Sequence, residues 1–125
     1  MANCVEESPI PLYDIVVPQG ADWDVAIRYE EPEGTPVDFS TATARCQIRV
    51  DYDKEIILEL SSASGTIQLG DGTGGTPNVV LKFTSGNTSA LSLYDGIYDL
   101  EVTLASGLVK KFLAGKFKLY REVTK

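Results

Sequence analysis

Apolar and polar residues alternate along most of this chain, which is the pattern of half-buried β-strands. The clearest case is segment 21–29, in which four apolar side chains share one face: Trp23, Val25, Ile27 and Tyr29. Small and charged residues occupy the other face of that segment. Four cycles of period two therefore predict a strand from Ala21 to Tyr29.

The same alternation predicts further strands over 12–17, 44–51, 56–60, 66–69, 78–84, 97–104 and 108–120. In the second of these, Cys46, Ile48 and Val50 are expected to point inward. In the last, Gly115 indicates a bulge or a close approach of another backbone, because glycine weakens a strand interior.

Turn-forming segments separate these strands at short intervals, and the most prominent are 31–36 and 70–77. One short helical turn is predicted near residues 87–92, with Asn87 and Thr88 as capping residues. Seven or eight strands without a long helix predict an all-β fold, a small barrel or an antiparallel β-sandwich. We favour the immunoglobulin-like sandwich.

Tyr98 follows an Asp-Gly turn and precedes the apolar Leu100 by two residues. Immunoglobulin-like sandwiches place a tyrosine corner two residues before a core position. The segment 91–102 therefore predicts a loop that enters a sandwich strand, with Tyr98 as the corner residue.

The length of 125 residues predicts one sandwich domain over 12–125. Residues 1–11 contain Pro9 and Pro11, which disfavour helix, so we expect an extended N-terminal arm. Two interpretations stay open for this arm: a frayed terminus, or a segment that lies on a neighbouring subunit.

The net charge of −7 argues against binding to nucleic acid and to an anionic membrane surface, because both need clustered basic residues. Residues 1–11 lack the apolar core of a signal peptide, and no apolar run reaches the length of a membrane span. Cys46 lies in an apolar alternation and is expected to be a buried free thiol, although a disulfide with Cys4 is an alternative. These features favour a reducing cytoplasm, or a particle assembled there.

No residue set predicts a catalytic, metal or cofactor site. The chain has no histidine, which removes the common triads and the usual zinc ligands. Carboxylates pair on strand faces at Asp22 with Asp24, Asp51 with Asp53, and Asp99 with Glu101, where a solvated face is the better interpretation than a glycosidase pair. A calcium ion at Asp71 in the glycine-rich loop is a weaker alternative to a mobile hairpin loop.

The aromatic residues divide into two groups. Trp23, Phe83, Phe112 and Phe117 are predicted to be core residues. Tyr13, Tyr94 and Tyr120 are candidates for an exposed cluster that would suit a protein partner or a stacked sugar. Tyrosines at the edge of the core, with their hydroxyls in water, are the better interpretation.

Basic residues concentrate near the C-terminus: Lys110, Lys111, Lys116, Lys118, Arg121 and Lys125. Two interpretations apply. Lysines on an exposed edge strand block unwanted strand addition. Alternatively, this basic region contacts an acidic face of the next copy in an assembly.

A series of short motifs resembles a known group of proteins. In chain order they are Gly34-Thr35-Pro36-Val37-Asp38-Phe39-Ser40, Ala44-Arg45, Ile48-Arg49, Gly65-Thr66-Ile67, Thr88-Ser89-Ala90-Leu91, Gly96-Ile97-Tyr98-Asp99-Leu100, Gly115 and Val123-Thr124. This order is similar to small β-sandwich modules of tailed bacteriophages, above all the N-terminal domain of baseplate upper proteins and related tail-fibre attachment proteins. Most of residues 20–124 take part in the resemblance.

The resemblance implies a non-enzymatic virion structural protein, a docking or adaptor module of the tail or baseplate that connects to fibres or neighbouring subunits. Its expected partners are other virion proteins, with homo-oligomers in the particle. The expected interface residues are Val5, Ile10 and Leu12 of the arm region and the basic last strand with Lys116, Lys118 and Arg121. In the family a fibre or stem follows the position of Val123-Thr124, whereas this sequence continues only to Lys125, so a capsid decoration protein is an alternative expectation. A carbohydrate-binding module is another alternative, because β-sandwiches often carry exposed aromatic residues.

Overall fold

The computed structural model describes residues 12–91 and 95–121. Within these ranges lie eight strands: β1 (Ile15–Pro18), β2 (Trp23–Ile27), β3 (Thr43–Arg49), β4 (Ile56–Ser61), β5 (Ile67–Leu69), β6 (Val79–Phe83), β7 (Asp95–Thr103) and β8 (Val109–Tyr120). A 3-10 turn, η1 (Thr73–Gly75), lies in the glycine-rich loop, and one short helix, α1 (Ser85–Ser89), connects β6 to β7.

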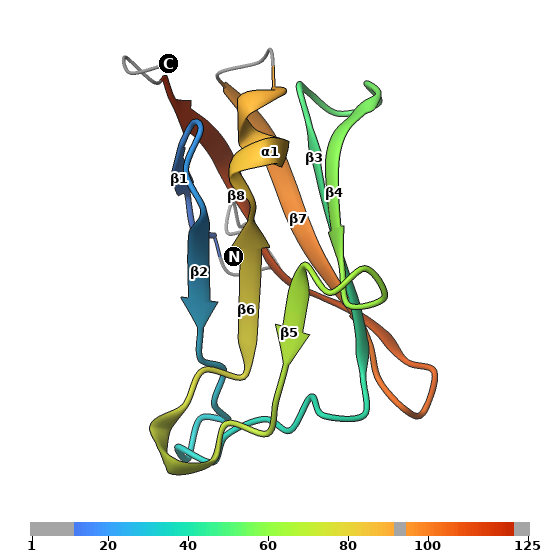
Figure 1. Cartoon of the computed structure of the whole chain (residues 1–125). Helices are drawn as coiled ribbons and strands as arrows, with labels where there is room; N and C mark the ends of the chain where they lie inside the picture. Colours follow the sequence, from blue (N-terminus) through green and yellow to red (C-terminus); the bar gives the residue numbers. More distant parts are fainter. Residues whose placement is uncertain (1–11, 92–94, 122–125) are drawn as a thin grey trace, which may run out of the picture.

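The strands form two sheets that pack as the layers of a sandwich (Figure 1). The larger sheet has the order β1-β8-β7-β3-β4, and the smaller has the order β2-β6-β5. The predicted all-β sandwich of seven or eight strands is therefore confirmed. All pairs are antiparallel except β1 and β8, which run parallel in the register Ile15–Phe117 to Pro18–Tyr120.

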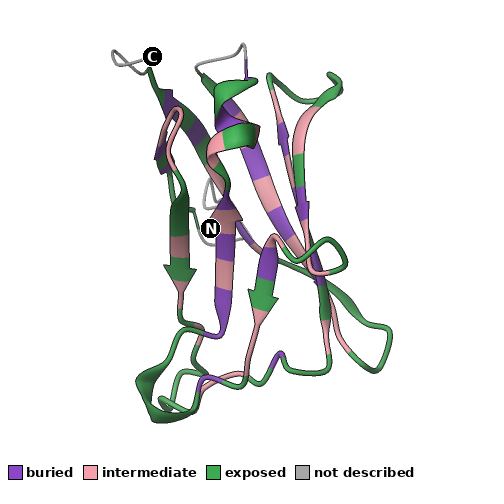
Figure 2. Ribbon diagram, viewed as in Figure 1, coloured by how far each residue is buried: buried purple, intermediate pink, exposed green. Residues whose placement is uncertain are grey.

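The core lies between the sheets, and buried residues alternate with more exposed ones along β6 and β7 (Figure 2). The predicted inward faces of both strands are confirmed, since Val79, Leu81, Leu100 and Val102 are fully buried. The predictions for Trp23 and Val50 are wrong, because these side chains are 45% and 50% exposed. Trp23 begins an edge strand, and Val50 follows the end of β3.

Phe39 is fully buried although it lies in an irregular link between β2 and β3. Its ring meets Tyr29 and Phe112 edge-on, with centroid distances of 6.0 and 5.1 Å. Tyr29 and Phe112 themselves lie 4.9 Å apart, and the Tyr29 hydroxyl donates to the Phe112 carbonyl. This aromatic group joins the link to both sheets, because Tyr29 follows β2 and Phe112 lies on β8.

Tyr98 is buried in β7, but it does not form the predicted tyrosine corner. Its hydroxyl donates to the carbonyl of Tyr13, 85 residues earlier in the chain. A tyrosine corner would bond to backbone only a few residues upstream. Tyr98 instead fastens the segment before β1 to the larger sheet.

The helical turn exists but begins earlier than predicted, and its capping residue is different. Thr84 caps α1, accepting a hydrogen bond from the Asn87 backbone N–H at 3.1 Å, whereas Thr88 is fully buried inside the helix. Of the helices in the described ranges, none has the length and apolar character that a membrane span requires.

Cys46 is a buried free cysteine, as predicted, and Cys4 lies outside the described residues. Burial raises the pKa of the Cys46 thiol from the ordinary 9.0 to about 12. Because the folded-state pKa is the higher one, the stabilisation is complete below the unfolded pKa and is lost as the pH rises above it.

We expect the free energy of unfolding to fall by about 1.4 kcal/mol between about pH 8 and about pH 10 through this thiol alone. Urea unfolding of the variants C4S and C4S/C46A at both pH values measures this fall in the free energy of unfolding. C4S should lose more stability than C4S/C46A over that interval. Equal losses would show that ionisation of Cys46 does not oppose folding.

Candidate functional site

The structure brings several predicted interface residues together on the outer face of the larger sheet. In the parallel register of β1 and β8, Ile15 and Val17 point inward together with Phe117 and Leu119. The alternate residues therefore project outward. We call this surface the β1–β8 patch: Leu12, Asp14, Val16, Lys116, Lys118 and Tyr120.

The patch combines exposed apolar side chains with lysines. Leu12, Val16 and Tyr120 are 68%, 51% and 67% exposed. Lys116 and Lys118 are exposed on β8, where Lys118 lies directly beside Val16 of β1. Neither lysine forms an ion pair within residues 12–91 and 95–121. Exposed apolar groups that gather on one face beside polar residues are typical of protein interaction surfaces.

Backbone contacts hold the segment before β1 against β8. The Tyr13 N–H donates to the Ala114 carbonyl at 2.8 Å, and the Lys116 N–H donates to the Asp14 carboxylate at 3.0 Å. Gly115 permits this approach, because a Cβ there would come within 2.8 Å of the Tyr13 carbonyl carbon. The predicted close approach at Gly115 is confirmed, whereas the bulge of β8 lies nearer Phe112, where the pairing with β7 shifts.

A cavity of about 270 Å³ opens beside the patch, lined in part by Asp14, Val16, Asp95 and the two lysines. The carboxylate of Asp14 is held by backbone, and Asp95 is the cross-strand neighbour of Lys118. The patch therefore combines both charge signs with exposed apolar side chains.

The edge-strand interpretation of the basic residues is only partly right. Along 114–120, β8 is an interior strand, because β1 and β7 flank it. The lysines there project from the face of the sheet rather than along its edge. Arg121 directly follows β8, and Val5 and Ile10 lie outside the described residues, as does Tyr94.

Away from the patch, the outer face of the larger sheet carries paired charges. Lys111 contacts Asp99 at 3.2 Å and Glu101 at 3.1 Å, and Arg45 contacts Glu101 at 3.2 Å. The hydrogen bond from Lys111 lowers the pKa of Glu101. Both carboxylates therefore contact cationic side chains, as in a solvated charged face.

Three other candidate carboxylates also have local partners. Asp22 accepts from the Ser85 N–H at 2.7 Å, Asp24 pairs with Lys82 at 3.0 Å, and Asp71 accepts from Thr73. Among the residues that the structure describes, no three histidines, cysteines or carboxylates gather as a metal site would require.

The sequence interpretation missed Val16 and Asp14. Val16 lies in the uninterrupted apolar run Ile15-Val16-Val17, which hides the alternation. The sequence interpretation also missed Tyr52, which is 76% exposed in the loop between β3 and β4.

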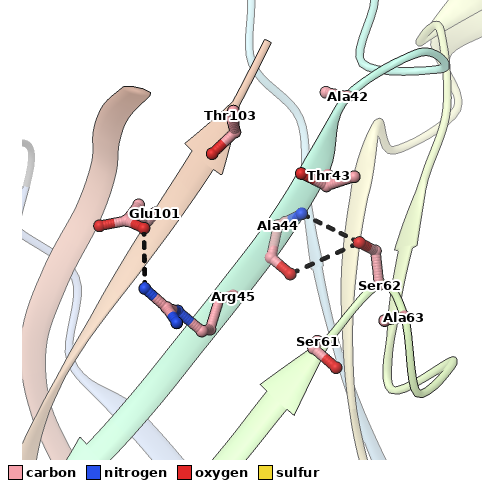
Figure 3. Close-up of a pocket in the computed structure, with 9 residues that line it drawn as sticks. All are labelled: Ala42, Thr43, Ala44, Arg45, Ser61, Ser62, Ala63, Glu101 and Thr103. Carbon is pink, nitrogen blue, oxygen red and sulfur yellow. Dashed lines mark hydrogen bonds and ion pairs between the residues drawn. The ribbon is translucent and has the colours of Figure 1, made fainter. Parts of the chain in front are cut away.

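The larger sheet has a second hollow, of about 640 Å³, where β3 begins and β4 ends (Figure 3). Small side chains line much of it, including Ala42, Ala44, Ser62 and Ala63, while Arg45 and Glu101 form one side. The hollow lies open to solvent beside the turn that follows β4.

No family model matches this chain. No curated protein matches it in sequence.

Similar solved structures are immunoglobulin-like domains. One is a VGSC beta subunit studied for multimeric cell-adhesive interactions, at 12% identity and a TM-score of 0.46, covering 95% of this chain and 98% of that one. A second comes from the complex of ICOS with ICOS-L and an anti-ICOS-L VNAR domain, at 11% identity and a TM-score of 0.41, covering 90% of this chain but only 55% of that one. Murine CRIg matches at 11% identity and a TM-score of 0.38, over 87% of this chain and 92% of its own. At these identities the similarity concerns the fold alone.

Proposed function

We propose that this chain is a non-enzymatic docking module that binds other protein subunits through the β1–β8 patch. The observation that carries the proposal is a shared sheet face. Leu12, Val16 and Tyr120 are all more than half exposed on it, beside two lysines that form no ion pair with any residue that the structure describes. Apolar side chains interspersed with charges of both signs suit a partner with an apolar, mixed-charge surface.

The partners that we propose are virion proteins of a tailed bacteriophage. The motif order from Gly34 to Val123-Thr124 supports this, because it resembles baseplate and tail-fibre attachment modules of the same β-sandwich class. In this function the module sits in the particle and connects fibres or neighbouring subunits. Repeated copies in the particle would multiply individually weak contacts.

A matched pair of double variants tests the patch. V16D/K118E changes one exposed valine and one exposed lysine of the patch, whereas V109D/K110E changes the same residue types at the other end of β8. Val16 and Val109 are 51% and 53% exposed, so both variants should fold.

The measurement is the amount of each variant in purified particles of the phage that encodes the chain, after complementation of a deletion. We expect wild type and V109D/K110E at equal copy number, and V16D/K118E reduced about tenfold or more. Full incorporation of V16D/K118E, or absence of the wild-type chain from the particles, would contradict the proposal. Disassembly into heads and tails then separates a baseplate module from a capsid decoration protein.

A carbohydrate-binding module is the second candidate function, because Tyr120 and Tyr13 are 67% and 53% exposed near the same strand pair. Exposed rings of this kind also stack on sugars. Glycan-array binding that is lost in Y120A and kept in V109D would favour this alternative over protein docking.

A further inference from the structure

Among the described residues β4 is an edge strand of the larger sheet, and along Ile56–Leu60 this edge has neither the lysine nor the proline that commonly blunt strand edges. β1 is four residues long and ends in Pro18, and β5 has only three residues. β2 carries an exposed charge at Asp24. β4 has six residues, Ile56–Ser61, with neither lysine nor proline, and its one charged side chain is Glu59. The features that blunt this edge are the charge of Glu59 and the register shift at Ile57.

The hydrogen bonds at the end of β4 show which backbone groups face outward. The Ser62 N–H donates to the Ala44 carbonyl at 3.0 Å, while Ser61 exchanges bonds with Thr66 on the opposite side. In an antiparallel pair the bonding direction alternates from residue to residue. Leu60 and Leu58 therefore bond toward β3, and the N–H and C=O of Glu59 face the free edge.

Aliphatic side chains accompany these open backbone groups. Ile56 is 42% exposed, and Ile57 and Leu58 are only half-buried at the edge. The register shift beside Arg49 leaves Ile57 without a directly opposed residue on β3. The Glu59 carboxylate is already satisfied on the outer face by Gln47, at 2.7 Å.

We propose that two copies of this chain pair through β4, antiparallel across a two-fold axis at Leu58. This register places Leu58 opposite its own copy, Leu60 opposite Ile56, and Glu59 opposite Ile57. No like charges oppose one another in it, whereas an axis at Glu59 would place two carboxylates together. A second copy therefore fits this edge through both its backbone and its side chains.

The same register brings two further features together. The loop before β4 carries Tyr52, 76% exposed, among the acidic residues Asp51, Asp53 and Glu55. Across the axis this loop of one copy runs beside the uncharged turn Ser62–Gly65 of the other. The 640 Å³ hollow with Ala44 and Ala63 lies at that turn, so Tyr52 of each copy fills the hollow of its partner.

This interface is distinct from the docking function proposed above, because β4 and β1 are opposite edges of the sheet. A dimer through β4 leaves both β1–β8 patches exposed. It is thus a bivalent connector, which would hold two partner subunits at once.

Sedimentation velocity of the full chain over a range of concentrations tests the dimer. We expect a concentration-dependent dimer for wild type and for V16D/K118E, but a monomer for E59P. Proline is tolerated on an edge strand at a position whose N–H would otherwise face solvent, so E59P should keep the circular dichroism spectrum of wild type.

A second variant tests the placement of Tyr52 in the same measurement. Y52S should weaken dimerisation about tenfold or more. Unchanged affinity in Y52S would overturn the placement of Tyr52 in the hollow.

Disulfide trapping checks the register independently of E59P. In the proposed register Leu58 and its copy are a non-hydrogen-bonded pair, because the backbone of Leu58 bonds toward β3. The Cα atoms of such a pair lie about 4.5 Å apart, which suits a disulfide. C4S/L58C should therefore form a disulfide-linked dimer under mild oxidation, whereas C4S/A26C, on the β2 edge, should not. A wild-type monomer at all concentrations, or trapping no greater for L58C than for A26C, would overturn the proposal while leaving the patch experiment unaffected.

Discussion

Replacing Asn78 by leucine should reduce the free energy of unfolding by about 4 kcal/mol, the largest effect that we expect from a single side chain here. Asn78 is fully buried directly before β6. Its amide accepts from the Tyr29 N–H at 2.8 Å and donates to the carbonyls of Tyr29 and Val37 at 2.9 and 2.8 Å. Leucine has a similar volume but leaves the Tyr29 N–H and the Val37 carbonyl without these partners inside the protein. The Tyr29 carbonyl loses one of its two donors and keeps the Val37 N–H.

The matched control is N87L, because Asn87 lies on α1 and its side chain is only partly buried. We expect N87L to change stability by less than about 0.5 kcal/mol. Urea unfolding at neutral pH measures both variants. A loss for N78L no greater than that for N87L would mean that the three bonds do not hold the link 29–37 in place.

The strands could be predicted because their side chains obey a local rule. Along β6 and β7 each residue alternates between the two faces, so the sequence records which ones are buried. Phe39 could not be found in this way. It lies in an irregular segment, and its burial depends on Tyr29 and Phe112, which only the packed sandwich brings to it.

Trp23 shows the opposite error. Its alternation with Val25 and Ile27 is regular, but β2 is an edge strand of a sheet with three strands, facing a larger sheet of five. Alternation identifies the inward face of a strand, but it does not show how far the opposite layer extends over that face. The ring therefore stays 45% exposed.

The candidate site was predicted as two separate features, Leu12 of the arm region and the basic last strand. Their juxtaposition depends on the parallel pairing of β1 with β8, which joins residues about 100 positions apart in the chain. No local pattern encodes such a register. Gly115 was the one local sign that another backbone passes close to β8, and it did not identify that backbone as the segment at Tyr13.

Replacing Gly115 by alanine should reduce the free energy of unfolding by about 3 kcal/mol, because the added methyl group overlaps backbone. It would lie 2.8 Å from the Tyr13 carbonyl carbon and 3.1 Å from the Asp14 carboxylate, so the segment before β1 must move away. The hydrogen bond from Tyr98 to Tyr13 would then be lost, as would the bond from Tyr13 to Ala114. Amide exchange in residues 12–18 should increase more than elsewhere in G115A.

The control is G86A, the same substitution at a glycine of α1 where an added Cβ meets nothing within 4 Å. Alanine is the better helix former, so G86A should be neutral or stabilising by up to about 1 kcal/mol. Because the β1–β8 patch exists only while β1 stays paired, G115A should also reduce incorporation into particles as V16D/K118E does, and G86A should not. If G115A kept wild-type stability and wild-type exchange at 12–18, the close approach that builds the patch would be refuted, and the docking surface with it.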